Sequence, residues 1–106
     1  MSRFSHYISA KHAVVGLTKC IALEYAVDNI RCVSVAPGFV ETPMTAEDLS
    51  EEQRGLMNAI IPMGRGSSPE EVANLIAWLA SSEASYITGS SHVIDGGILA
   101  GFVLPE

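Results

Sequence analysis

Two side chains near the start of this sequence have the types and the spacing that proton transfer requires. Tyr7 and Lys11 are four residues apart, which on a helix places both side chains on one face with about 5–6 Å between their Cβ atoms. A tyrosine phenol titrates at about 10 and therefore exchanges protons poorly at neutral pH. A neighbouring ammonium favours the phenolate, and a phenol tuned in this way can pass a proton to or from a substrate oxygen.

The pair alone is a weak signal, because Tyr and Lys at this spacing occur by chance in many helices, where both side chains face solvent. The surrounding residues do predict a helix, since apolar residues recur at helical spacing from Ser9 to Tyr25. One stripe contains Ala10, Ala13, Val14, Leu17 and Ile21, and a second contains Val15, Ala22 and Ala26. We therefore expect a helix over Ser9–Tyr25 that is buried on more than one side.

Two short apolar runs predict strands, Ile30–Ala36 and Ser91–Asp95. The first run does not alternate between apolar and polar residues, which is typical of a parallel strand covered on both faces. Because a long helical crossover separates the two runs, we expect parallel pairing with a right-handed connection. The expected fold class is α/β: a partial, doubly wound Rossmann-type sheet of two parallel strands with flanking helices.

Helices are predicted between these strands. An irregular stretch is expected to begin at Thr42-Pro43, and one or two short helices follow it over Ala46–Ile61. A longer helix is expected to begin at Ser68, which caps it, with Pro69 in the first helical position and Glu71 closing a capping box.

The composition limits the function classes. With 106 residues, 48% hydrophobic and 17% charged, the chain has the size and composition of one folded domain. A net charge of -6 gives no electrostatic reason to expect nucleic-acid binding, and no apolar run is long enough for a membrane span. Cys20 and Cys32 are too few for a disulfide scaffold, so we expect buried, reduced thiols in a cytoplasmic protein. His6, His12 and His92 lack metal-ligand spacing, and no metal site is expected.

Four motifs resemble those of the short-chain dehydrogenase/reductase family and occur in that family's order. They are residues 7–19 for its catalytic helix, Ile30-Arg31 with Val35–Met44 for the next strand and Pro-Gly loop, Met63–Arg65 with Ser68–Ala73 for the start of its last large helix, and Ile87–Gly89 with Val93–Gly97 for its final strand. The resemblance implies that residues 1–106 are the C-terminal half of a Rossmann domain of this family.

The resemblance also implies an activity. A member of this family is an oxidoreductase dependent on NAD or NADP, which moves a hydride between the nicotinamide and an alcohol or carbonyl carbon. Tyr7 would be the general acid/base. Lys11 would assist Tyr7 and hydrogen-bond the ribose of the nicotinamide.

Cofactor contacts are implied for the Pro-Gly loop. The backbone around Pro37, Gly38 and Val40 would pass beside the nicotinamide, and Thr42 would hydrogen-bond the cofactor's carboxamide or phosphate groups. Residues 43–62 match the family's variable substrate loop. Without the family context, Pro37-Gly38 is equally well explained as a pair that only ends a strand, and Thr42 as a residue that only forms a turn.

The family's cofactor-binding motif is not found in these 106 residues. There is no G-x-G-x-x-G, and the nearest match, Gly64-Arg65-Gly66, lacks the third glycine and leads into Pro69. The resemblance places the catalytic serine upstream of Met1, since Ser2 and Ser5 are too close to Tyr7, and the catalytic asparagine is absent too. We therefore expect an isolated chain that is inactive: part of a larger protein, a truncated product, or one half that assembles with a missing N-terminal half.

A second hypothesis is a non-catalytic, self-associating fragment or interaction module. The mean hydropathy of +0.29 is high for a domain of this size. The helix beginning near Ser9 and the segment 68–95 resemble the subunit contacts of the complete enzymes. A homo-oligomer, a dimer or a tetramer, is expected on either hypothesis, so whether the chain is an enzyme stays open at this point.

Overall fold

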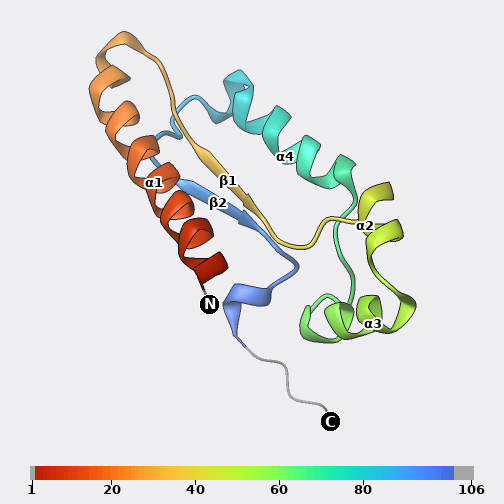
Figure 1. The fold of residues 1–106 in the computed structure, drawn as a ribbon. Coiled ribbons are helices and arrows are strands. Elements are labelled where there is room, and N and C mark those ends of the chain that lie inside the picture. The colour runs from red at the N-terminus through yellow and green to blue at the C-terminus, as the bar shows by residue number, and fades with distance from the viewer. Residues whose placement is uncertain (1, 102–106) are drawn as a thin grey trace. The chain divides into compact units, whose positions relative to one another are not determined.

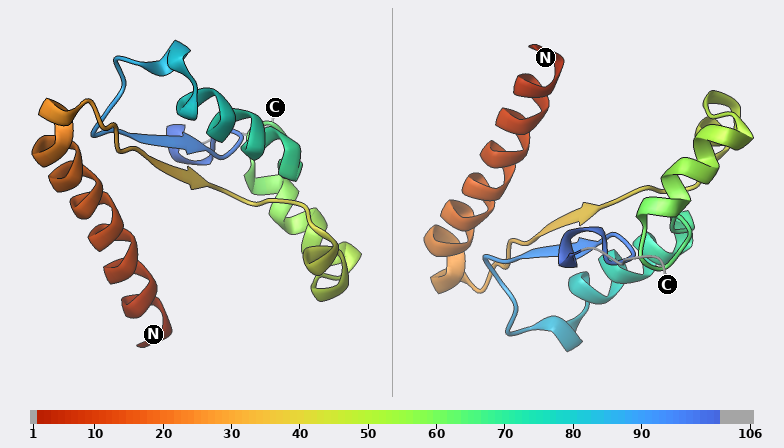
Figure 2. Two further views of the ribbon diagram at one scale, coloured as in Figure 1. Left: turned by 90° about the horizontal axis from the view of Figure 1, so that it is seen from above. Right: turned by 90° about the horizontal axis from the view of Figure 1, so that it is seen from below.

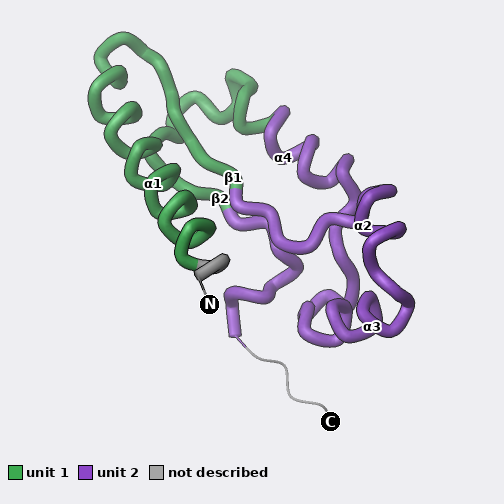
Figure 3. The backbone as a smooth tube through the Cα atoms, in the orientation of Figure 1, with its two compact units in different colours: residues 1–35, 78–92 green, residues 36–77, 93–106 purple. Residues whose placement is uncertain are grey.

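The computed structural model describes residues 2–101, and Figure 1 shows the helices and strands of this part of the chain. The helices are α1 (Ser2–Tyr25), α2 (Pro43–Asp48), α3 (Glu51–Ile60) and α4 (Pro69–Ala80), and the strands are β1 (Ser34–Pro37) and β2 (Ser91–Ile94). Two compact units are coloured separately in Figure 3: of the described residues, unit 1 contains those up to Val35 and Trp78–His92, and unit 2 contains Ala36–Ala77 and those from Val93 onwards.

β1 and β2 form a two-stranded sheet, and they lie side by side in Figures 1 and 2. The Ser34 N–H donates to the Ser90 carbonyl (3.1 Å), and further along the Gly38 N–H donates to the Ile94 carbonyl (2.9 Å). The pairing thus advances in the same chain direction on both strands, which makes the sheet parallel. The predicted fold class, α/β with two parallel strands and flanking helices, is confirmed.

β1 begins at Ser34, later than the predicted Ile30. The preceding segment bonds instead to the turn before β2: the Cys32 carbonyl accepts from the Gly89 N–H (2.7 Å), and the Cys32 N–H donates to Thr88 Oγ1 (3.0 Å). These bonds satisfy backbone groups without forming a regular ladder.

Helix α1 of unit 1 is longer than the predicted Ser9–Tyr25, and the two predicted apolar stripes are not both covered. Thr18 and Ala22 are buried, and the Thr18 hydroxyl donates to the Val14 carbonyl (2.7 Å). Val14 and Leu17, in the first predicted stripe, are 54% and 60% exposed. The prediction of burial on more than one side is therefore wrong for the described chain: Ala22 of the second predicted stripe is buried, whereas Val14 and Leu17 of the first stripe are exposed.

Arg31 joins the start of β1 to the end of α4 within unit 1. Its guanidinium donates to the carbonyls of Leu79 (2.8 Å), Ser81 (3.1 Å) and Ile87 (3.4 Å). The last carbonyls of a helix have no partner within the helix, and a cation there also complements the helix dipole. This single side chain thus completes the C-terminal end of α4.

Unit 2 contains two short helices with capping boxes at their starts. Thr42 caps α2 reciprocally with Thr45, and Pro43 takes the first helical turn, so the predicted irregular stretch at Thr42-Pro43 is wrong. The signal was the same one that predicts α4, a hydroxyl cap followed by proline. Ser50 caps α3 reciprocally with Gln53, and the two helices confirm the prediction of short helices before residue 61.

The chain enters and leaves the α2–α3 segment through a paired stretch that we call the neck, Phe39–Glu41 against Gly66–Ser67. The Glu41 N–H donates to the Ser67 carbonyl (2.8 Å), and the Ser67 N–H donates to the Phe39 carbonyl (2.9 Å), around a parallel bridge between Val40 and Ser67. A Cβ added at Gly66 would be 2.5 Å from Phe39 Cδ1, so the Phe39 ring would have to shift for any larger residue at this position.

Candidate active site

Tyr7 and Lys11 lie one turn apart on α1, within unit 1. The Lys11 Nζ atom is 5.3 Å from the centroid of the Tyr7 ring, a distance at which an ammonium is attracted by the face of an aromatic ring. Tyr7 is 59% exposed, so its phenol is accessible to a small molecule. The structure thus brings together the two residues singled out for proton transfer, and their catalytic role stays a prediction.

The predicted cofactor contacts lie on the Pro-Gly loop, residues 37–42, within unit 2. A Cβ atom added at Gly38 would be 2.8 Å from Asp95 Cβ and 3.0 Å from Asp95 Cα. No side chain fits between these backbones, which explains the glycine. Pro37 and Gly38 are exposed, so the backbone that was predicted to pass beside a nicotinamide is open to a ligand.

Val40 and Thr42, the other predicted cofactor residues, are each half-buried and already have a structural task. Val40 belongs to the neck. The Thr42 hydroxyl accepts a hydrogen bond from the Thr45 N–H (3.2 Å), while its own proton stays available to donate. The structure brings these residues together with Pro37 and Gly38 on one loop, and their contact with a cofactor remains a prediction.

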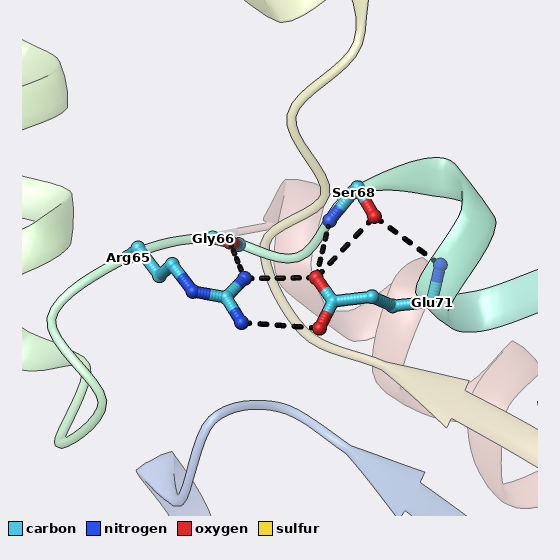
Figure 4. Close-up of polar contacts among 4 residues, drawn as sticks. All are labelled: Arg65, Gly66, Ser68 and Glu71. Carbon is cyan, nitrogen blue, oxygen red and sulfur yellow. Dashed lines mark hydrogen bonds and ion pairs between the residues drawn. The ribbon is translucent and has the colours of Figure 1, made fainter.

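An ion pair that the sequence analysis did not identify holds the end of the neck (Figure 4). Arg65 Nη1 and Nη2 donate to Glu71 Oε1 (2.8 Å) and Oε2 (3.1 Å). Arg65 Nη1 also donates to the Gly66 carbonyl (3.0 Å), and Glu71 Oε1 accepts from the Ser68 N–H (2.9 Å). The capping box of Ser68 and Glu71 is confirmed, since the Glu71 N–H donates to Ser68 Oγ (3.3 Å). Glu71 therefore serves two partners at the start of α4.

The same contacts set the protonation of the pair. The hydrogen bond from Arg65 and then the backbone hydrogen bond from Ser68 lower the pKa of Glu71 from 4.5 to about 2. The hydrogen bond to Glu71 raises the pKa of Arg65 above its usual range. Both groups are charged across the physiological pH range, although their side chains are 51% and 43% exposed.

Two hollows of unit 2 bear on binding. A cavity of about 70 Å³ lies beside the ion pair, and the buried Ser67 Oγ there has no hydrogen-bond partner. This volume suits a water molecule and not a dinucleotide. An open groove of about 450 Å³ runs along α3, lined by Leu49, Gln53, Leu56, Met57 and Ile60. The groove lies in the segment that the resemblance assigns to the substrate loop.

The sequence also led to expectations about metal ligands, membrane spans and the two cysteines. Across residues 2–101, no three His, Cys, Asp or Glu side chains gather as a metal site requires. No helix in the same range is long and apolar enough to cross a membrane. Both cysteines are free thiols; the predicted burial is wrong for Cys20, which is exposed, and Cys32 is half-buried.

The parallel two-stranded sheet with flanking helices defines a class of fold, the partial Rossmann-type α/β domain. A family model described as enoyl-(acyl carrier protein) reductase matches residues 1–99. The chain is 48% identical over 96 residues to cyclohexanol dehydrogenase of Acinetobacter sp. (strain SE19), covering 91% of this chain and 37% of that protein. It is 50% identical over 95 residues to the 3-oxoacyl-[acyl-carrier-protein] reductase FabG of Thermotoga maritima, covering 90% and 38%.

Solved structures agree with these relatives. A 4-hydroxyisoleucine dehydrogenase complexed with NADH superposes with a TM-score of 0.84 at 36% identity, covering 92% of this chain and 40% of that one. Acetoin dehydrogenase from Enterobacter cloacae gives a TM-score of 0.79 at 44% identity, covering 96% and 39%. The chain belongs to the short-chain dehydrogenase/reductase family, and it spans less than half the length of these relatives.

Proposed function

We propose that this chain carries the proton-transferring part of an oxidoreductase that uses NAD or NADP. Hydride would move between the nicotinamide and an alcohol or carbonyl carbon, while the Tyr7 phenol exchanges a proton with the substrate oxygen. Lys11 would hold the phenol ready for this exchange and donate to the nicotinamide ribose. Pro37, Gly38 and Val40 would line the nicotinamide with backbone groups.

The observation that carries this proposal is the Tyr7–Lys11 pair, with the ammonium 5.3 Å from the ring centroid on an exposed helix face. Family membership supports the assignment, and the NADH in the structure of the related 4-hydroxyisoleucine dehydrogenase supports the choice of cofactor. The apolar groove along α3 supports a substrate with an apolar portion. Two free thiols fit the reducing conditions of the cytoplasm.

The 106-residue chain should not turn over by itself, because its residues include no glycine-rich loop to bind the cofactor diphosphate. Calorimetric titration of the purified chain with NADH and, separately, NADPH tests whether the chain alone binds a cofactor. We expect no saturable binding at micromolar concentrations and no consumption of either cofactor with a carbonyl substrate. Turnover by the chain alone that disappears in Tyr7→Phe would overturn the expected inactivity of the chain and would support the assignment of Tyr7.

A second candidate function, self-association without catalysis, is favoured by the apolar face of α1. Val14 and Leu17 are more than half exposed there, and burial of apolar surface yields about 25 cal/mol per Å². We propose a dimer or tetramer in which another copy of the chain covers this face. An N-terminal half of the domain is the other candidate to cover it.

Sedimentation of the chain tests self-association. Leu17→Gln should shift the mass towards that of a monomer, while Lys19→Gln, a polar exchange on the same helix, should leave the mass unchanged. A monomeric wild-type chain at hundred-micromolar concentration would rule out this second candidate, without bearing on the role of Tyr7.

A further inference from the structure

The Pro-Gly loop is fixed on two sides by contacts within unit 2. On one side the Gly38 N–H donates to the Ile94 carbonyl (2.9 Å), and Gly38 is closely packed against Asp95. On the other side the neck holds Phe39–Glu41 through its two hydrogen bonds to Ser67 (2.8 and 2.9 Å). The conformation of the loop therefore depends on where Ser67 is held.

Arg65 and Glu71 hold Ser67 from both directions along the chain. Arg65 precedes the neck strand Gly66–Ser67, and its guanidinium bonds both the Gly66 carbonyl and the Glu71 carboxylate. Ser68 follows that strand, and its N–H bonds the same carboxylate (2.9 Å). Glu71 lies in the first turn of α4, so a single carboxylate anchors both ends of Gly66–Ser67 to this helix, as Figure 4 shows.

We propose that Arg65 and Glu71 are positioning residues for the Pro-Gly loop. Through the neck they fix the backbone of residues 37–42 in the conformation that would line the nicotinamide. The effect on cofactor binding rests on the proposed function. A bidentate, charge-assisted pair suits this task, because it sets the orientation of both groups as well as their distance. Arg65→Lys keeps the charge but loses the planar group that donates two parallel hydrogen bonds to the carboxylate.

Hydrogen exchange of single amides, followed by NMR on the 106-residue chain, tests the proposal. In Glu71→Gln and in Arg65→Met we expect the Glu41 and Ser67 amides to exchange about tenfold faster or more, since local opening of the neck becomes easier. The Gly38 amide, bonded to Ile94 instead of Ser67, should keep its rate. Arg65→Lys should give an intermediate acceleration at Glu41 and Ser67.

Ser50→Ala is the matched control, because it removes the equivalent cap of α3 in the same unit. It should leave the Glu41 and Ser67 rates unchanged. If a variant loses its helical circular dichroism, Ser68→Ala serves instead, since it removes only the hydroxyl bonds (3.3 Å) to Glu71, and it should accelerate the same two amides less. Unchanged rates in all of these variants, or equal acceleration of Gly38, would overturn the positioning role.

A cofactor titration separates this inference from the proposed function. With millimolar NADH, the Val40 and Thr42 amide signals of the wild-type chain should shift, and Arg65→Met should shift them less. Equal shifts in wild type and Arg65→Met would overturn the positioning role. No shift in the wild-type chain would count against the cofactor contacts of the proposed function, and the exchange rates would still decide the role of the ion pair.

Discussion

The two groups of predicted site residues are positioned by different kinds of contact. Tyr7 and Lys11 are brought together by the period of one helix, and their surroundings are largely solvent. The Pro-Gly loop is positioned by residues far away in sequence, Asp95 behind Gly38 and Ser67 beside Val40. Substitutions of Tyr7 and Lys11 should therefore affect chemistry with little effect on folding, whereas substitutions around the loop should affect both.

The largest effect on folding is expected for Gly38→Ala. The new Cβ would be 2.8 Å from Asp95 Cβ and 3.0 Å from Asp95 Cα, and backbone atoms cannot move aside as a side chain can. We expect a loss of about 1–3 kcal/mol in the free energy of unfolding, the range for overpacking. Urea unfolding measures it; a stability equal to that of the wild-type chain would show that the loop is not fixed against Asp95.

Glu71→Gln should destabilise the chain in a pH-dependent way. Because the pKa of Glu71 is lowered from 4.5 to about 2 in the folded chain, its contribution to stability is complete above pH 4.5 and is lost as the pH falls towards 2. The difference in unfolding midpoint between wild type and variant should therefore be greatest near neutral pH and shrink through this window. A difference that is constant from pH 7 to pH 3 would contradict the role of the carboxylate.

Gly16→Ala in α1 should raise the free energy of unfolding, whereas Gly38→Ala should lower it. A Cβ at Gly16 has no neighbouring atom within 4 Å, and alanine is the better helix former by about 0.5–1 kcal/mol. Thermal unfolding should show this stabilisation. Gly55→Ala in α3, where the Cβ is equally unobstructed, serves as the control, and destabilisation in both would mean that these helix faces are covered.

The smallest effect on folding is expected for Tyr7→Phe. The side chain is 59% exposed, and an exposed substitution of this kind changes stability by about 0.5 kcal/mol or less. Chemical unfolding of the two chains compares them directly. A large loss of stability would show that the phenol has a structural partner, and would weaken the contrast between α1 and the loop.

The sequence predicts what local rules determine. Helical spacing placed Tyr7 beside Lys11, and the hydroxyl, proline and glutamate at Ser68–Glu71 marked the start of α4. Burial of the first apolar stripe of α1 was predicted wrongly, because a stripe such as the one with Val14 and Leu17 does not reveal what lies against it. Arg65 was missed because its partner is six residues away, across the start of a helix, where no periodic rule relates two side chains.

The Pro-Gly loop shows the same limit. Its proline and glycine were recognised from the sequence, and the reason for Gly38 became visible only when Asp95 was found against it. Contacts between segments separated by dozens of residues depend on the fold, and they cannot be predicted from composition or residue spacing.

The most direct test of the central claim is turnover in a reconstituted enzyme. The 106-residue chain is mixed with the segment of the Thermotoga maritima reductase that precedes its match to this chain, and consumption of NADH or NADPH is followed with the 3-oxoacyl substrate of that reductase. We predict activity in the mixture and in neither part alone, and a loss of about 10²–10⁴-fold when Tyr7→Phe replaces the wild-type chain. Equal activity of the mixtures made with wild type and with Tyr7→Phe would contradict the assignment of Tyr7 as the group that transfers the proton.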